Sequence, residues 1–110
     1  MLPLKRAPEY KRRLRYYAHD LTQRYGPDVA EAFLKRVQAE EHLIRDNNQV
    51  GTSVPYIFAG QHILLRECYF DSGPAKYCLI YDILEDCVAL ISLWHGKGAR
   101  EDGILVRRWK

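Results

Sequence analysis

The sequence has few of the residues from which disulfide frameworks and metal sites are built. Its 110 residues include only three cysteines, and they form no CxxC pair and have no histidine at metal-ligand spacing. An odd count without such spacing is typical of reduced thiols packed in a core. We therefore expect no disulfide scaffold and no bound metal, and no motif indicates another cofactor.

Long apolar runs are also absent. No window reaches the ~18 uninterrupted apolar residues of a membrane-spanning helix, and the basic segment 1–17 is not followed by the apolar core of a signal peptide. The sequence therefore predicts a cytoplasmic protein with no membrane partner. Its length predicts one domain over residues 1–110 that is large enough to bury a core.

The net charge of +3 is unevenly distributed. Residues 1–25 carry seven Lys/Arg and two acids, residues 26–95 carry five and ten, and residues 96–110 carry five and two. Basic ends around an acidic middle suit an anionic partner, either nucleic acid or an acidic protein segment. The alternative is that both ends, including a basic tail over residues 97–110, are simply solvated.

Two amphipathic helices are predicted in the first half. Pro8 is a favourable first helical residue, and apolar side chains recur after it at spacings of three and four up to Gly26. A second periodic run follows Pro27 and ends near Asp46. A connection this short predicts an antiparallel helical hairpin. We expect its shared apolar face to cover a sheet and the acids Glu40-Glu41 to be solvated.

The second half predicts strands. Apolar runs over 61–70, 76–84 and 87–95 are separated by Asp71-Ser72-Gly73-Pro74 and by Glu85-Asp86, which are typical of hairpin turns. Residues 2–7 suit an edge strand, and residues 104–106 suit a strand, a helical turn or a tail. The predicted fold class is α+β, with two layers in the order β-α-α-β-β-β: an antiparallel sheet with the helical hairpin on one face.

The turns also predict a register. A first hairpin centred on Gly73 places Cys68 opposite Cys78, and a two-residue second loop places Lys76 opposite His95. Opposed residues share a face, so Arg66, Lys76 and His95 would form a cationic cluster on the face away from the helices. Such a cluster suits phosphate binding, with His95 as an acid or base. The alternative is that the three side chains are separately solvated.

Four segments carry a resemblance to a known family. They are Ala18-His19-Asp20-Leu21, Ala30-x-x-Phe33, Tyr77 to Ile83 (YCLIYDI) and Val88 to Gly96 (VALISLWHG). In this order and spacing the chain resembles, over about residues 5–100, the RelE/ParE superfamily of bacterial type II toxins. The resemblance implies the two-layer fold predicted above. It also implies a cognate antitoxin that neutralises the toxin, in an assembly left open between a homodimer and a toxin–antitoxin hetero-oligomer.

The superfamily has two functional branches. RelE-like toxins cleave mRNA on the ribosome and use an arginine in the third strand, where this sequence has Cys78. A cysteine cannot stabilise the charge of a phosphodiester transition state. The ending Trp94-His95-Gly96, followed by Arg100 and Asp102, looks more like ParE. ParE-like toxins bind DNA gyrase and trap it on cleaved DNA.

The resemblance therefore favours a non-enzymatic gyrase inhibitor, with a RelE-like mRNA endonuclease as the alternative and an inactive relative as a third reading. In the alternative, Arg66, Lys76 and His95 would be catalytic and the partners would be the ribosome and mRNA. In the favoured reading, cations near the helical hairpin and the tail would contact the antitoxin or gyrase. These candidate partner-binding residues are Arg12, Arg13, Lys76, His95, Lys97 and Arg100.

Overall fold

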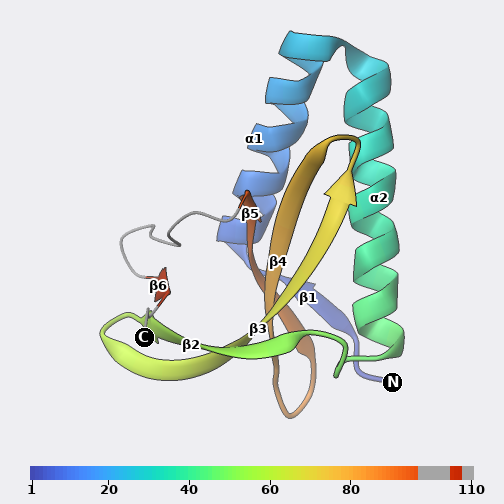
Figure 1. Cartoon of the computed structure of the whole chain (residues 1–110). Helices are drawn as coiled ribbons and strands as arrows, with labels where there is room; N and C mark the ends of the chain where they lie inside the picture. Colours follow the sequence, from blue (N-terminus) through green and yellow to red (C-terminus); the bar gives the residue numbers. More distant parts are fainter. Residues whose placement is uncertain (97–104, 108–110) are drawn as a thin grey trace.

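The computed structural model describes residues 1–96 and 105–107. Two helices and six strands follow one another along the chain, and the helices form one layer against a mixed sheet (Figure 1). The bounds are β1 (Leu4–Arg6), α1 (Pro8–Tyr25), α2 (Pro27–Asp46), β2 (Thr52–Phe58), β3 (Gln61–Ser72), β4 (Ala75–Ile83), β5 (Val88–His95) and β6 (Leu105–Arg107).

The helical hairpin is where the sequence predicted it. Each helix has a proline in its first turn, and Gly26 between them has φ +97°, a conformation that glycine adopts readily. The predicted α+β class and helix bounds are confirmed.

The sheet is larger than predicted and is not wholly antiparallel. Its strand order is β1-β5-β4-β3-β2-β6, and β1 pairs in parallel with β5, while every other neighbouring pair is antiparallel. Residues Thr52–Phe58 form a strand of their own because Ala59 and Gly60, with φ +49° and +81°, make a two-residue hairpin turn. Of the three structures considered for residues 104–106, the strand is present as β6.

The predicted hairpin register was wrong by one residue. The β3–β4 turn has two central residues, Gly73 and Pro74, so Ser72 pairs with Ala75 and Cys68 lies opposite Leu79. In the second hairpin the Glu85-Asp86 loop is as predicted, with the Leu84 N–H donating to the Cys87 carbonyl at 2.8 Å. A bulge then shifts the pairing near Ile80, so His95 faces Tyr77 rather than Lys76.

Two apolar clusters form, one on each face of the sheet. The helix-facing cluster packs Tyr10, Phe33, Val37 and Ile44 against side chains of β3, β4 and β5. On the opposite face, Leu65, Cys78 and Ile80 are buried with side chains of β2. In Figure 1, β3 bends away from β4 and runs with β2 across the lower part of the molecule. This bend goes with the packing of β2 side chains against those of β3 and β4 on this face. The face away from the helices, where we expected a cationic binding cluster, is largely occupied by this second apolar cluster.

Candidate functional site

The predicted cationic cluster of Arg66, Lys76 and His95 is not assembled. Arg66 lies on the helix-facing side, opposite Tyr81, and donates to the Gly51 carbonyl and the Gln49 Oε1, each at 2.8 Å. His95 shares that face but lies opposite Tyr77, four residues farther along β4, or about 13 Å in an extended strand.

Lys76 is on the other face, because it is adjacent to Tyr77 in the strand. Its Nζ lies 3.0 Å from the Asp71 Oδ1. The predicted cluster depended on the β3–β4 and β4–β5 registers, and it does not form because both differ from the prediction.

The same register separates the cysteines. Cys78 is fully buried on the face away from the helices, whereas Cys68 faces the helices. The Cys68 thiol donates to Glu40 Oε2 at 3.0 Å. Burial and this carboxylate raise the pKa of Cys68 to about 12. The two thiols therefore act as core side chains and cannot pair with each other.

Arg13 holds α1 against the open edge of β5. The pairing of β1 with β5 ends at Leu90, and farther along β5 the Arg13 Nε donates to the Leu93 carbonyl at 2.7 Å. The guanidinium carbon lies 3.6 Å from the centre of the Trp94 ring. The Tyr17 hydroxyl accepts from the His95 N–H at 3.0 Å and from Arg13 at 3.1 Å. Arg13 is thus committed to contacts within the fold.

Three exposed cations lie on the outer side of α1. Arg12 pairs with Glu9, one helical turn away, and its side chain is 61% exposed. Lys11 and Arg15 are exposed and form no ion pair with any residue that the structure describes. We call Lys11, Arg12 and Arg15 the basic row. The predicted binding residues Lys97 and Arg100 lie outside the described residues.

A groove of about 760 Å³ lies at the far end of the helical hairpin. One wall is the second half of α1 with the first turns of α2, and the other is the β3–β4 turn, residues 72–75. Tyr77 and His95 line it from the sheet. The sequence did not predict this groove, because it is formed where three segments distant in sequence meet: the helical hairpin, residues 72–77 and His95.

The aromatic side chains at the base of the groove contact one another. The ring centres of Tyr77 and His95 are 5.2 Å apart and those of Tyr17 and Tyr77 are 5.7 Å apart, both edge-to-face. Burial raises the pKa of Tyr77, with smaller contributions from Tyr17 and Asp20. This hydroxyl therefore stays protonated well above neutral pH and is a poor general base.

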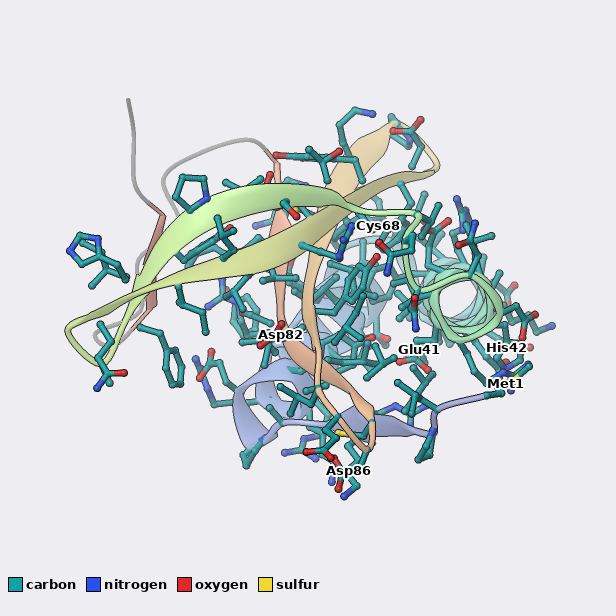
Figure 2. All side chains as sticks on the ribbon, turned by 90° about the horizontal axis from the view of Figure 1, so that it is seen from below. Met1, Glu41, His42, Cys68, Asp82 and Asp86 are labelled. Atoms are coloured by element: carbon teal, nitrogen blue, oxygen red, sulfur yellow. The ribbon has the colours of Figure 1, made fainter. Side chains whose placement is uncertain are left out.

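Two carboxylates that we expected to be solvated are buried on the inner side of α2. Glu41 accepts from the Tyr10 hydroxyl at 2.6 Å and from the Arg6 Nε at 3.2 Å, and Glu40 pairs with Arg36 at 2.8 Å. Figure 2, which looks along α2, shows Glu41 on the sheet side of the helix and His42 on its outer side. Burial and the Glu41 charge raise the pKa of Tyr10. The Arg6–Glu41–Tyr10 set joins β1, α1 and α2, which is a structural role.

Within residues 1–96 and 105–107 there is no group of three or more His, Cys, Asp or Glu side chains placed to hold a metal ion. Neither helix of that part of the chain is both long and apolar enough to cross a membrane.

Comparison with known proteins gives no relative: no family model, no curated protein and no solved structure matches this chain.

Proposed function

We propose that this chain is the toxin of a bacterial type II toxin–antitoxin module, of the ParE-like kind that inhibits DNA gyrase by binding and is neutralised by a cognate antitoxin. The four segments that resemble the RelE/ParE superfamily suggest the family. The order of two helices and then antiparallel strands is compatible with it.

One observation favours binding over cleavage. The position at which RelE-like toxins use an arginine is Cys78, which is fully buried, and the three alternative cations Arg66, Lys76 and His95 are divided between two faces and two ends of the sheet. Cleavage of a phosphodiester needs cations fixed together around one phosphate. No such set exists among these residues.

The basic row supplies a surface for an acidic partner. Lys11, Arg12 and Arg15 project from one side of α1, and two of them have no ion pair among the described residues. Exposed cations of this kind raise the rate and specificity of association with an anionic surface more than they add affinity. Both an acidic antitoxin segment and an acidic surface of gyrase suit this row.

The proposal is tested with two assays run in parallel. Purified gyrase is made to supercoil a relaxed plasmid, and a message is translated in a cell-free system, each with added protein. We expect loss of supercoiling and accumulation of cleaved plasmid, with the message intact. Cuts in the message with normal supercoiling would instead establish the mRNA endonuclease, and silence in both assays with retained antitoxin binding would establish an inactive relative.

A charge reversal locates the surface. The double substitution Lys11→Glu and Arg15→Glu should weaken gyrase inhibition roughly tenfold at low salt and less at high salt, because exposed charges are screened. Each single reversal is compared with Lys35→Glu, which changes the net charge by the same two units at a side chain that is 75% exposed on α2. A loss with Lys35→Glu equal to that with Lys11→Glu or Arg15→Glu would mean that net charge, not the basic row, matters.

A further inference from the structure

The groove at the end of the helical hairpin gathers unusual exposed apolar surface. Tyr16 and Tyr25 are 64% and 66% exposed and Val29 is 42% exposed, and all three line it. Large apolar side chains scattered singly on a surface need no explanation, but several that line one concavity are characteristic of a binding site. Tyr16 follows Arg15 and lies one turn from Arg12, so the basic row borders one end of the groove. Tyr25 and Val29 lie at its other end, at the α1–α2 turn beside Asp28.

The shape of the groove favours a helical or extended peptide segment. It is open and about 760 Å³ in volume, between the helices and residues 72–75 of the β3–β4 turn. Figure 1 shows the α1–α2 turn extending beyond the β3–β4 turn, so the side walls belong to different layers. An amphipathic helix seats its anchors at spacings of i, i+3 or i+4, and i+7 in such grooves.

The charged side chains that line the groove determine which charge a bound peptide should carry next to its apolar residues. Asp20 is paired with Arg24, whose Nε lies 3.1 Å from the Asp20 Oδ1. Asp28 is exposed and has no ion pair with a described residue. The charged side chain that lines the groove without an ion pair to a described residue is therefore an acid. An acidic peptide would be repelled, and a basic flank would be attracted.

We infer that this groove binds an amphipathic peptide segment whose apolar side chains contact Tyr16, Tyr25 and Val29 and whose flanking Lys or Arg lies beside Asp28. This occupant differs in charge from the acidic partner expected at the basic row, so the protein has two docking surfaces of opposite preference. The inference does not depend on the gyrase proposal, because its test uses neither gyrase nor ribosomes.

The test uses two synthetic peptides of about 15 residues, long enough to form a helix when stabilised. Both carry the same leucines at helical spacing, one flanked by lysines and the other by glutamates. Fluorescence anisotropy with the full chain should show binding of the lysine peptide that is about tenfold tighter than that of the glutamate peptide at low salt. Equal binding, tighter binding of the glutamate peptide, or no binding of either would overturn the inference.

Matched variants locate the binding. Val29 and Leu34 are each 42% exposed on α2, but only Val29 lines this groove. Val29→Gln should weaken binding of the lysine peptide about tenfold, whereas Leu34→Gln should leave its affinity unchanged. Asp28→Asn should reduce the difference in affinity between the lysine and glutamate peptides, while both peptides still bind through their leucines. Circular dichroism confirms that each variant is folded.

Two further outcomes would also overturn the inference. One is a loss of peptide binding that is equal in Val29→Gln and Leu34→Gln, which would place the site elsewhere. The other is sedimentation that shows a dimer broken by Val29→Gln but not by Leu34→Gln, because the groove would then hold a second copy of this chain.

Discussion

Replacing Arg13 by glutamine should destabilise the protein although the residue lies on a surface helix. The substitution removes a charged donor from the Leu93 carbonyl, a stacking contact 3.6 Å from the centre of the Trp94 ring, and a donor to the Tyr17 hydroxyl. A hydrogen bond from a charged group contributes about 1.5–3 kcal/mol and a cation–π contact about 0.5–2 kcal/mol. The Arg13 side chain is only 18% exposed, so water screens these contacts little. Because the glutamine amide can still donate one hydrogen bond, we take a combined loss near the low end, about 2 kcal/mol.

This loss should be measurable by urea denaturation and by thermal unfolding. At roughly 4–6 °C per kcal/mol for a domain of this size, Tm should fall by about 10 °C. Arg12→Gln is the control, since the exposed Arg12–Glu9 pair should contribute less than about 1 kcal/mol. Arg13→Lys should recover only part of the loss, because a lysine cannot stack as a plane and donate in two directions.

A Tm for Arg13→Gln within about 2 °C of the unsubstituted protein would refute the reasoning. It would mean that water satisfies the open edge of β5 as well as Arg13 does. A double-mutant cycle with Trp94→Leu then separates the ring contact from the backbone hydrogen bond.

The remaining predictions concern pH and packing. The pKa of Cys68 is raised from 9.0 to about 12, so the unfolded state loses its proton first and stability is lost as pH rises from about 9 towards 12. At pH 10.5 we expect urea denaturation to show about 1–2 kcal/mol less stability than at pH 8 from this thiol. Cys68→Ala should lessen the pH dependence, and an unchanged profile would contradict the assignment. Gly51→Ala should cost about 1–3 kcal/mol, because the new Cβ would lie 2.7 Å from the Tyr81 hydroxyl and 3.0 Å from the Glu67 carbonyl. Gly60→Ala, where the Cβ meets open space but φ is +81°, should cost only about 1 kcal/mol; a larger cost than at Gly51 would contradict the packing argument.

The helices were predictable from sequence because their signals are local. Apolar spacing of three and four, a proline in each first turn and Gly26 between them act within a few residues, and the structure has α1 and α2 where these signals placed them. The Glu85-Asp86 loop was predictable for the same reason. The parallel pairing of β1 with β5 was not, since it joins residues more than 80 positions apart.

The burial of Glu40 and Glu41 was not predicted for a related reason. Glu40 and Glu41 follow Val37 and precede Ile44 at core spacing on α2, which is a signal that could have been read. A charged residue at a core position is usually interpreted as solvated unless its partner is known. Arg6 lies far away in the chain, so only the folded structure identifies it as the partner of Glu41. Glu40 has its ion-pair partner Arg36 one turn away on α2, and the folded structure adds the Cys68 thiol as a donor.

The predicted cationic cluster failed through two shifts of register, one at the β3–β4 turn, which separates Arg66 from Lys76, and one at a bulge in β5. In a strand, a shift of one position moves every following side chain to the opposite face, and the bulge in β5 near Ile91 does this before the strand reaches His95. No turn signal marks such a bulge, because it lies in the middle of an apolar run. Its consequence is that Lys76 and His95 lie on opposite faces and His95 joins Tyr17 and Tyr77 at the groove. Two one-residue shifts of register therefore decide whether this sheet offers a set of cations around a phosphate or aromatic side chains at the base of a peptide-binding groove, and the observed pairing favours the second.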